Sequence, residues 1–573
     1  MSPSSIVPRR ALLGLVCACT SACITACTVG EPLTPSSPGA PLAAGSTTPA
    51  EISVSPAAVT VKVGGKVAVA AAVTNTSGQP VSGASIAWTA ANPAIATVTT
   101  TGMVTAVATG TTTVSATING LTATTPVNVV PAATATATLG STAQAIKGWG
   151  MYPAGGSALY SRPTIRNAIY ATGLTFIRTQ IDPATYQSGS TLSDITINTN
   201  TLVILEQQLQ EAQAQGIDNY IISIWSPPAS MKTNHSTLGM SGGVAGQLDS
   251  TQEGAFVAYV TRVLMTLRTD GLPLPQALSI QNEPDFAATS YSGCTYSVAQ
   301  WTRVIEAMRV SFDANGLGAV LLFGPETGTY GGAVYSNAST YTPGYFGGPG
   351  FPSLASDATF NHAVGAYAFH TYGECQIAGL NSGLQAVPKD AWMTEFSEPN
   401  GTTETAWTLD MLAALGAHLA LVPNNYWAWW NGYADVTTPD NQTLIGGDQT
   451  PVYSKRYWAL KALWTTVRPG WLVTHMTTTD NSLLVSLGSQ DPCAARVDLV
   501  AFTRPDKGAA AVLMVNPTTQ SKLIAVGGLP GSTAQIYRTD ANANMAAQPP
   551  ATITGGVATI PLPPNSAVLT VAQ

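Results

Sequence analysis

Apolar and polar residues alternate in short runs through residues 51–131. Strand-like segments such as "VTVKV", "SIAWTA" and "TTVSATI" follow one another, with Gly and Asn turns between them. Alternation with a period of two predicts strands with one buried face, and a series of short strands is typical of a β-sandwich. We therefore expect a small all-β domain in this part of the chain.

The pattern changes after residue 132, where helical and strand-like segments alternate. "LVILEQQLQEAQAQG" places Leu202, Leu205 and Leu209 on one helical face, and the buried strand "YIISIW" follows at once. The same alternation continues with "FVAYVTRVLMTLR", "ALSIQ", "SVAQWTRVIEAMRVSF" and "AVLLFG". Repeated strand–helix units predict a (β/α)8 TIM barrel over residues 144–466, with its active site where the strands end. Beyond the barrel the helical period fades, and strands such as "RVDLVAFTR" and "SAVLTVA" predict a second β-region.

The first residues have the features of an export signal. Arg9 and Arg10 precede the apolar stretch "ALLGLV", and small residues follow. "ITAC", which ends at Cys27, resembles the bacterial lipobox, so residues 1–27 are expected to be a lipoprotein-type signal peptide with Cys27 as the lipidated residue. Weaker alternatives for the anchor are Cys19 and Cys23, and a plain signal peptide cut nearby is the competing interpretation.

Composition supports an exported protein without nucleic-acid partners. Of the 573 residues only 9% are charged, and the net charge of −7 contains no basic run that would bind nucleic acid or a membrane surface. Residues 28–50 are rich in Pro, Ser and Gly and are expected to form a linker. We expect a monomer in the cell envelope or outside the cell, attached to the membrane only by its lipid.

Two carboxylates are candidates for catalysis. "SIQNEPDF" places Glu283 after a short apolar run, and "WMTEFS" places Glu395 in the same position of a later strand. These strands are expected to be the fourth and seventh of the barrel, whose ends lie across its mouth. Two facing carboxylates suit hydrolysis of a glycosidic bond, in which one carboxyl group must carry a proton and the other must be ionised.

Several motifs resemble glycoside hydrolase family 30, a member of the large retaining clan of (β/α)8 enzymes. In order they are "GWG", "FIRTQID", "SIWSPPASMKTN", "SIQNEPD", "AFHTY", "WMTEFS" and "RYWALKALWTTVRPG". The resemblance covers about residues 134–573 and implies a β-sandwich side domain built from residues 134–143 and 467–573. The earlier segment around Trp88 resembles the bacterial Ig-like domains of group 2, which implies that fold for residues 51–131 and says little about a ligand.

The resemblance also implies roles for individual residues. Glu283 matches the general acid/base, Glu395 the nucleophile, and Asn282 the amide that binds the sugar hydroxyl beside the reacting carbon. The positions that match residues around the nucleophile are Arg178, His370 and Tyr372. No cofactor and no metal are implied, and the spacing of the cysteines outside the signal matches no metal site.

Tryptophans near the strand ends are candidates for sugar stacking, because sugar C–H faces are apolar. Trp225 follows the third strand, and Trp427 and Trp429 lie on one face of the eighth. We expect these three to line the pocket and Trp430 to pack beneath the helices; a role in the core alone is the alternative. No chemistry is assigned to Asp182 or Glu326.

The loop after the eighth strand bears on the substrate. Relatives that cut glucuronoxylan have basic residues there, whereas this loop has no Arg before Arg456 and contains three aspartates: Asp435, Asp440 and Asp448. A neutral β-linked polysaccharide is therefore expected, either xylan or a β-1,6-linked galactan or glucan, cut internally or from an end. The alternatives are a surface carbohydrate-binding or adhesion protein with a non-catalytic barrel, and a glucosylceramidase-like exo-enzyme.

Three cysteines lie outside the signal. Cys294 and Cys375 each follow a strand end on the catalytic face by several residues, so we expect a disulfide between them. Two unpaired thiols are the alternative, since sequence does not fix connectivity. Cys493 is expected to be unpaired.

Overall fold

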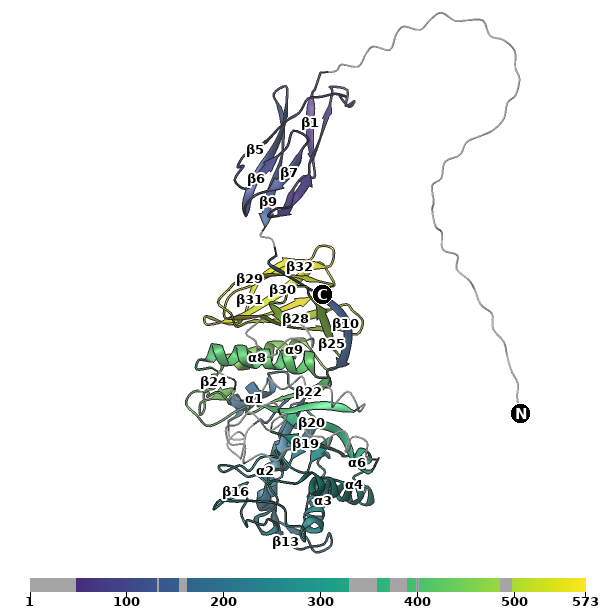
Figure 1. Ribbon diagram of the computed structural model, residues 1–573, viewed down its shortest axis with the longest axis vertical. Coiled ribbons are helices and arrows are strands. Elements are labelled where there is room, and N and C mark those ends of the chain that lie inside the picture. Colours follow the sequence, from purple (N-terminus) through teal and green to yellow (C-terminus); the bar gives the residue numbers. More distant parts are fainter. Residues whose placement is uncertain are drawn as a thin grey trace, which may run out of the picture. The chain divides into compact units, whose positions relative to one another are not determined.

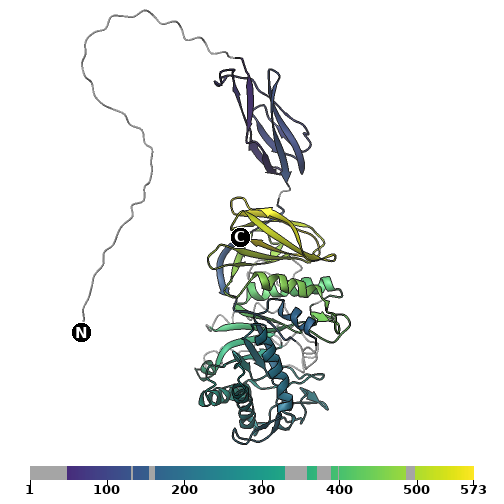
Figure 2. The ribbon, with the colours of Figure 1, turned by 180° about the vertical axis from the view of Figure 1, so that it is seen from behind.

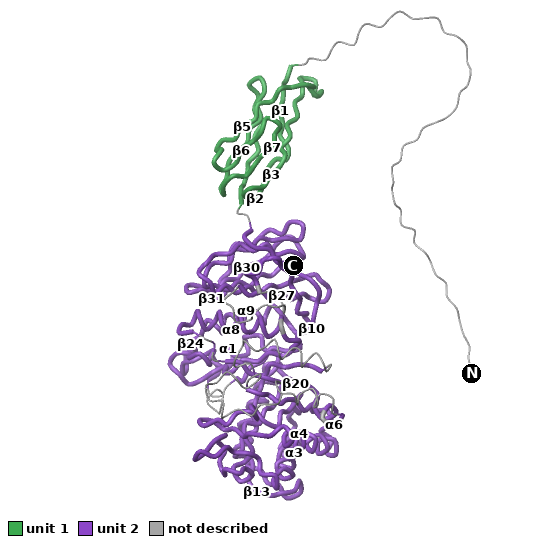
Figure 3. The backbone as a smooth tube through the Cα atoms, in the orientation of Figure 1, with its two compact units in different colours: residues 1–130 green, residues 131–573 purple. Residues whose placement is uncertain are grey.

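The computed structural model describes residues 48–130, 133–153, 162–328, 358–370, 389–397, 399, 401–484 and 497–573. The chain divides into two compact units, Met1–Val130 and Pro131–Gln573, which are coloured separately in Figure 3. Each unit has a hydrophobic core of its own. Among the helices that are described, none has both the length and the apolar character needed to cross a membrane.

The first unit is an all-β sandwich, as predicted. Its four-stranded sheet has the order β2 (Val59–Lys62), β9 (Leu121–Val130), β8 (Gly110–Ile118) and β5 (Ala87–Ala90). Another sheet has the order β3 (Lys66–Ala68), β7 (Met103–Ala106) and β6 (Ala96–Val98), and β1 (Glu51–Ser55) pairs with β4 (Ala70–Thr74). Inward-facing valines such as Val104 and Val114 form the core, and Trp88 packs against it.

In the second unit, eight parallel strands close into a barrel, which confirms the predicted fold class (Figure 1). The strands are β11 (Gly148–Met151), β12 (Phe176–Gln180), β15 (Tyr220–Ser223), β18 (Ala277–Ser279), β19 (Leu321–Thr327), β20 (Val364–His370), β21 (Asp390–Phe396) and β22 (Asn424–Trp429). The described helices between and after them are α1 (Pro163–Tyr170), α2 (Thr199–Ala214), α3 (Glu253–Thr269), α4 (Val298–Ala314), α6 (Ala358–Ala363), α8 (Glu404–Leu421) and α9 (Lys455–Thr466).

Short elements occupy the loops of this unit. Strand pairs are β13 (Tyr186–Ser188) with β14 (Thr196–Ile197), β16 (Met240–Ser241) with β17 (Val244–Ala245), and β23 (Ile445–Gly446) with β24 (Val452–Tyr453). Single 3₁₀ turns are η1 (Pro183–Thr185) and η2 (Ala229–Met231). Loops of this kind carry the functional groups of a barrel, because the strands hold them in fixed positions.

Large rings fill the inside of the barrel. Phe176, Trp392 and Tyr426 belong to a buried cluster to which only barrel strands contribute. A Cβ atom on Gly150 would lie 2.3 Å from the Phe176 ring, and one on Gly148 would lie 2.6 Å from the Tyr426 ring. The "GWG" motif is therefore explained by packing, since β11 has no room for side chains on its inner face.

The remaining strands form one ten-stranded sheet beside the barrel. Its main path has the order β31 (Ala543–Thr552), β30 (Thr533–Asp540), β33 (Ser566–Ala572), β28 (Ala510–Asn516), β27 (Val497–Thr503), β25 (Leu472–Thr477), β10 (Ala135–Ala145), β29 (Lys522–Gly527) and β32 (Val557–Leu562), and β26 (Leu483–Leu484) pairs with β27. Strand β10, which precedes the barrel, pairs with β25 and β29 from the end of the chain.

The barrel and this sheet share a core. Helices α8 and α9 lie between them, which both views of the ribbon show (Figures 1 and 2). Trp149 of β11 stacks on Trp464 of α9 with ring centroids 6.2 Å apart, and it meets Phe502 of β27 edge-on at 6.4 Å. Because aromatic side chains from the barrel, a helix and the sheet are in contact, the sheet covers apolar surface that the barrel would otherwise expose.

Removal of β10 tests how far the sheet depends on it. A chain that starts at residue 133 keeps this strand, and we expect it to be soluble and to unfold cooperatively. A chain that starts at residue 146 leaves β25 and β29 with unpaired edges inside the sheet, so we expect insoluble protein or a much lower unfolding temperature. Soluble yield and thermal unfolding of the two chains measure this, and equal behaviour would contradict it.

Candidate active site

Irregular backbone at the strand ends brings three glutamates together. In the register between β19 and β20, Glu326 is the extra residue of a bulge, and its φ is 54°. Met393 and Phe396 of β21 pair with Trp427 and Trp429 of β22, so β21 has one extra residue between the two pairs. Glu395 lies in this stretch. Glu283, a few residues after β18, has a φ of 48°, and its backbone N–H donates to the Glu326 carbonyl at 3.0 Å. Bulges change the direction of side chains, and here they place carboxylates in the barrel mouth.

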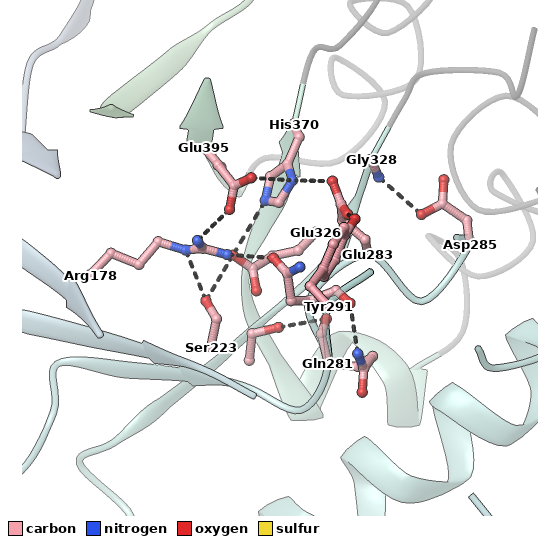
Figure 4. A network of polar contacts seen from close by, with 12 residues as sticks. Arg178, Ser223, Gln281, Glu283, Asp285, Tyr291, Glu326, Gly328, His370 and Glu395 are labelled. Atoms are coloured by element: carbon pink, nitrogen blue, oxygen red, sulfur yellow. Dashed lines mark hydrogen bonds and ion pairs between the residues drawn. The ribbon is translucent and has the colours of Figure 1, made fainter. Parts of the chain in front are cut away.

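The guanidinium of Arg178 contacts several side chains of the site (Figure 4). It is 1% exposed and donates to Glu395 Oε2 at 2.6 Å, Asn282 Oδ1 at 2.7 Å and Glu326 Oε1 at 3.1 Å. Its Nε donates to Ser223 Oγ at 3.0 Å, and this hydroxyl donates to Glu326 Oε1 at 3.0 Å. A planar guanidinium with five N–H groups can orient several acceptors at once, so Arg178 fixes the position of Glu395.

Glu283 lies opposite Glu395 and has different partners. His370 Nδ1 is 3.1 Å from Glu283 Oε1, and the Tyr291 hydroxyl donates to Glu283 Oε2 at 2.6 Å. One carboxylate oxygen of Glu283 and one of Glu395 lie within 4.8 Å of each other. Both glutamates are almost fully buried, with exposed fractions of 6% and 7%. The two carboxylates therefore face each other over a short gap, one beside Arg178 and the other beside a tyrosine hydroxyl.

Charges determine the protonation of the groups behind this pair. Burial alone would raise the pKa of Glu326, but Arg178 and His370 outweigh it and hold the pKa at about 2. Burial alone would lower the pKa of His370, but the carboxylates of Glu395, Glu283 and Glu326 raise it to about 9. At neutral pH the site therefore contains an ionised Glu326 and a protonated His370.

Asp285 is a further buried carboxyl group near Glu283. Burial raises its pKa to about 7, although a hydrogen bond from the Gly328 N–H, at 2.9 Å, opposes the rise. The bond joins the loop after β18 to the residue that follows β19. A Cβ atom on Gly328 would lie 3.0 Å from Glu283 Oε1, so this glycine lets the backbone pass close to the carboxylate.

An aromatic wall adjoins Arg178, and part of it differs from the prediction. The ring of Trp225 stacks against the guanidinium, with 4.5 Å between its centroid and Arg178 Cζ. Trp225 therefore lies beside the site, as predicted. Trp430, expected beneath the helices, instead stacks on Tyr152 at 4.2 Å and lies 5.4 Å from Trp225. Among the described residues, the aromatic wall beside Arg178 thus contains Trp225, Tyr152 and Trp430.

Trp427 and Trp429 do not line the pocket, which corrects the prediction. Both are fully buried in the core between the strands and the helices, and Trp427 Nε1 donates to His418 Nδ1 of α8 at 3.1 Å. They share a face, as the alternation predicts, but it is the outer face. Tyr426 belongs to the cluster inside the barrel. Side chains alternate between the two faces of a strand, so an assignment that is wrong by one residue places every side chain on the opposite face. The prediction for β22 was wrong in this way.

The charged residues after β22 pair with other protein groups. Arg162 Nη2 lies 3.0 Å from Asp435 Oδ2 and 2.7 Å from Asp448 Oδ1. Arg456 is fully buried, and its Nη2 lies 2.6 Å from Glu404 Oε1. These contacts anchor the loop and leave both guanidinium groups engaged within the protein.

Four predicted residues lie outside the described part of the chain: Cys27, Tyr372, Cys375 and Cys493. Cys294 is a buried free cysteine among the described residues, and burial raises the pKa of its thiol to about 12. The free thiol of Cys294 contradicts the predicted Cys294–Cys375 bridge, whereas the role of Tyr372 stays a prediction. Of the other predicted residues, the structure gathers Arg178, Trp225, Asn282, Glu283, His370 and Glu395.

Glu326 and Tyr291 are site residues that sequence reasoning missed. Glu326 is the second-last residue of the segment "AVLLFGPET", and a carboxylate near the end of a buried strand is the signal that marks it as a candidate. Tyr291 lies in a loop without periodicity, 38% exposed, and nothing in the sequence indicates its contact with Glu283.

Among the described residues of the site, one set of atoms has a spacing that suits a metal ion. Glu283, His370 and Glu395 each place a ligand atom within 4.8 Å of the others. However, the raised pKa of His370 keeps its imidazole protonated at neutral pH, and a protonated imidazole has no lone pair for a metal. Arg178 also occupies Glu395 Oε2. The arrangement is better suited to proton transfer than to metal binding.

The raised pKa of His370 predicts a pH-dependent contribution to stability. Its folded pKa of about 9 lies above the ordinary value of 6.5, so the stabilisation is full below pH 6.5 and is lost as the pH rises through 9. We expect the difference in unfolding free energy between wild type and His370→Gln to fall by roughly 2 kcal/mol between pH 7 and 9.5. Urea unfolding followed by tryptophan fluorescence measures it.

His418→Gln is a matched control. Burial lowers the pKa of His418 to about 3, so its charge does not change above pH 7 and its effect on stability should be constant there. The same pH slope in both variants would contradict a protonated His370.

Comparison with known proteins supports both folds. Residues 50–129 match the family Bacterial Ig-like domain (group 2), which confirms this part of the identification. A glycoside hydrolase family 30 subfamily 8 xylanase from Clostridium acetobutylicum has 21% identity and a TM-score of 0.59, over 77% of this chain and 99% of that one. A family 30 endoxylanase from Clostridium papyrosolvens has 22% identity and a TM-score of 0.57, over 77% and 99%.

Another similar structure is an endo-β1,6-glucanase with 16% identity and a TM-score of 0.52, over 80% of this chain and 97% of that one. In a comparison with curated proteins no match is found. At these identities the likeness to solved structures concerns the fold. The chain thus contains a bacterial Ig-like domain of group 2, followed by a barrel and side sheet with the fold of glycoside hydrolase family 30 structures.

Proposed function

We propose that this protein is an exported, retaining glycoside hydrolase that cleaves β-glycosidic bonds in a neutral polysaccharide. Glu283 is the general acid/base and Glu395 the nucleophile. Asn282 and the aromatic wall hold the sugar, and Arg178 and His370 hold the carboxylates. The substrate is xylan-type or a β-1,6-linked galactan or glucan.

The separation of Glu283 and Glu395 carries the proposal. Their carboxylate oxygens approach within 4.8 Å. Retaining glycosidases have carboxyl groups about 5–5.5 Å apart, whereas inverting enzymes need about 6.5–9.5 Å to hold a water between them. The short gap supports direct attack on the sugar by one of the two carboxylates.

The different partners of the two carboxylates support their roles. Arg178 stabilises the negative charge of Glu395, as a nucleophile requires. In the first step Glu395 attacks the anomeric carbon while Glu283 gives its proton to the glycosidic oxygen, so the leaving alcohol departs and an ester forms. In the second step Glu283 takes a proton from water, whose oxygen attacks the same carbon and releases Glu395.

A neutral substrate is supported by the pairing of the basic groups. Arg162 and Arg456, beside and within the region after β22, form ion pairs inside the protein, so neither is available for a uronate carboxylate there. The structures with similar folds are described as xylanases and as an endo-β1,6-glucanase, which are the substrate classes expected from the sequence.

Export and the arrangement of domains belong to the same proposal. The N-terminal signal pattern supports lipidation at Cys27, which lies outside the described residues. The Ig-like unit then serves as a spacer between the lipid and the catalytic unit, because it forms a compact unit with its own core.

Substitution of the two glutamates tests the mechanism. Glu395→Gln should reduce kcat/KM by at least about a thousandfold on every substrate, because the attacking group is lost. Glu283→Gln should keep the first step on a 2,4-dinitrophenyl glycoside, whose leaving group needs no proton, and azide should restore turnover. Release of nitrophenol and of reducing ends measures the two reactions.

The control is Glu51→Gln, an exposed glutamate in the first unit, which should retain wild-type rates. NMR of the first product should show the β-anomer. An α-anomer, or a Glu395→Gln variant with substantial activity, would exclude the double displacement.

Deletion of residues 1–131 tests the spacer role. We expect kcat/KM on a soluble oligosaccharide to remain within about twofold of the full chain, because separate compact domains function independently. A tenfold loss would mean that the Ig-like unit takes part in substrate binding.

A further inference from the structure

Glu326 is a fully buried charged residue of the site, with an exposed fraction of 0%. A substrate in the barrel mouth cannot touch a side chain that has no accessible surface, so Glu326 takes no part in the two chemical steps. Removing a carboxylate from water costs several kcal/mol unless charged or hydrogen-bonding partners compensate for it. The partners of Glu326 therefore indicate what it does.

The side chain of Glu326 binds the cation that holds the nucleophile. Glu326 Oε1 accepts from Arg178 Nη2 at 3.1 Å and from Ser223 Oγ at 3.0 Å (Figure 4). The same guanidinium donates through Nη1 to Glu395 Oε2 at 2.6 Å, and through Nε to Ser223 Oγ at 3.0 Å. Glu326 and Ser223 thus restrict the rotation of the guanidinium that binds Glu395.

The backbone of Glu326 binds the acid/base. Its carbonyl accepts from the Glu283 N–H at 3.0 Å, and both residues have a positive φ, 54° for Glu326 and 48° for Glu283. Glu326 is the extra residue of the bulge between β19 and β20, and a bulge changes the direction of the groups around it. One residue therefore contacts the backbone of the acid/base and the cation beside the nucleophile.

His370 adds a contact on the side of the acid/base. Its Nε2 lies 3.8 Å from Glu326 Oε1, and its Nδ1 lies 3.1 Å from Glu283 Oε1. The charge of Glu326 therefore acts on the imidazole that contacts Glu283. Glu326 is one of the carboxylates that raise the pKa of His370 to about 9, and its own pKa of about 2 keeps it ionised at neutral pH.

We propose that Glu326 is a positioning residue that couples the two catalytic carboxylates. The proposal rests on the proposed function and adds a residue to it. The carbonyl of Glu326 fixes the backbone of Glu283, and its negative charge fixes Arg178 and His370, which contact Glu395 and Glu283. Removal of this charge alone should change the behaviour of both carboxylates, although the substitution leaves both of them in place.

The titratable groups around Glu326 determine the direction of the effect. They are Arg178 on β12, His370 on β20, Glu395 on β21, and Glu283 and Asp285 in the loop after β18. A nearby negative charge makes protons harder to release, so its loss lets the surrounding groups release their protons at lower pH. Both limbs of a pH–rate profile then move to lower pH.

Glu326→Gln tests the coupling, because the amide keeps the shape of the side chain and removes its charge. We expect kcat to fall by about tenfold to a hundredfold with KM within about threefold of wild type, since Glu326 holds reacting groups and does not touch the substrate. Both limbs of kcat/KM against pH should move down by at least about half a unit. Hydrolysis of xylohexaose or a β-1,6-linked glucohexaose, whichever the wild type cuts, measures these values.

Glu326→Asp keeps the charge and withdraws the carboxylate by one CH₂ group. It should lower kcat by at least about threefold, because the contact with Arg178 lengthens, and leave both limbs of the profile at their wild-type positions. If Glu326→Gln does not fold, this variant decides alone: the expected loss in kcat supports the coupling, and a wild-type kcat overturns it.

Glu253→Gln is the matched control for the loss of charge. Glu253 begins α3, and its Oε1 lies 2.9 Å from Arg303 Nη2, outside the site. This variant should match wild type in rate and in pH profile. A Glu326→Gln variant with wild-type kcat, or with a lower kcat and unchanged limbs, would overturn the coupling, because Glu326 would then act only through packing.

A measurement without substrate separates this inference from the proposed function. The chain contains five histidines, and the NMR signal of a ring-labelled histidine that disappears in His370→Gln belongs to His370. Its pKa of about 9 should be lower by at least about one unit in Glu326→Gln and unchanged in Glu253→Gln. An unchanged value in Glu326→Gln would overturn the role of the charge even in an active enzyme. The expected shift in a protein that cuts neither hexaose would refute the proposed function and support the action of Glu326 on His370.

Discussion

The buried guanidinium of Arg178 is the interaction on which the site depends. A cation taken out of water inside a barrel is stable only with well-placed acceptors, because the cost of desolvation is several kcal/mol. Arg178 has them from several strands: Glu395 at 2.6 Å, Asn282 at 2.7 Å and Glu326 at 3.1 Å. Each of these partners is itself buried, and its burial would be destabilising without a charged or polar neighbour.

Charge balance follows from the same contacts. Arg178 and the protonated His370 carry two positive charges, and the three glutamates around them carry up to three negative ones. The cluster is therefore neutral when one of the three carboxyl groups holds a proton. A carboxyl group in such a site can release a proton and take it back with little rearrangement of the surrounding side chains, because the compensating charges are already in place.

Local signals in the sequence predict most of this site, and backbone irregularities explain the rest. The alternation of strands and helices predicts the barrel, and the strand-end motifs predict Glu283 and Glu395. The strand-end position of Glu326 marks it as a candidate, but its inward direction comes from a bulge, and a pattern of period two does not show the extra residue. Trp427 and Trp429 were placed on the wrong face because two faces of a buried strand are both apolar, so the pattern does not distinguish them.

The position of β10 has a consequence for the order in which the protein acquires its structure. Thr138 pairs with Thr477, a partner 339 residues later in the chain. The strand leaves a ribosome long before its neighbours β25 and β29 exist, whereas the Ig-like unit is complete by then. Contacts between such distant segments slow folding, because a long loop must close before they form. The second unit therefore completes the pairing of β10 only after β29 has been synthesised.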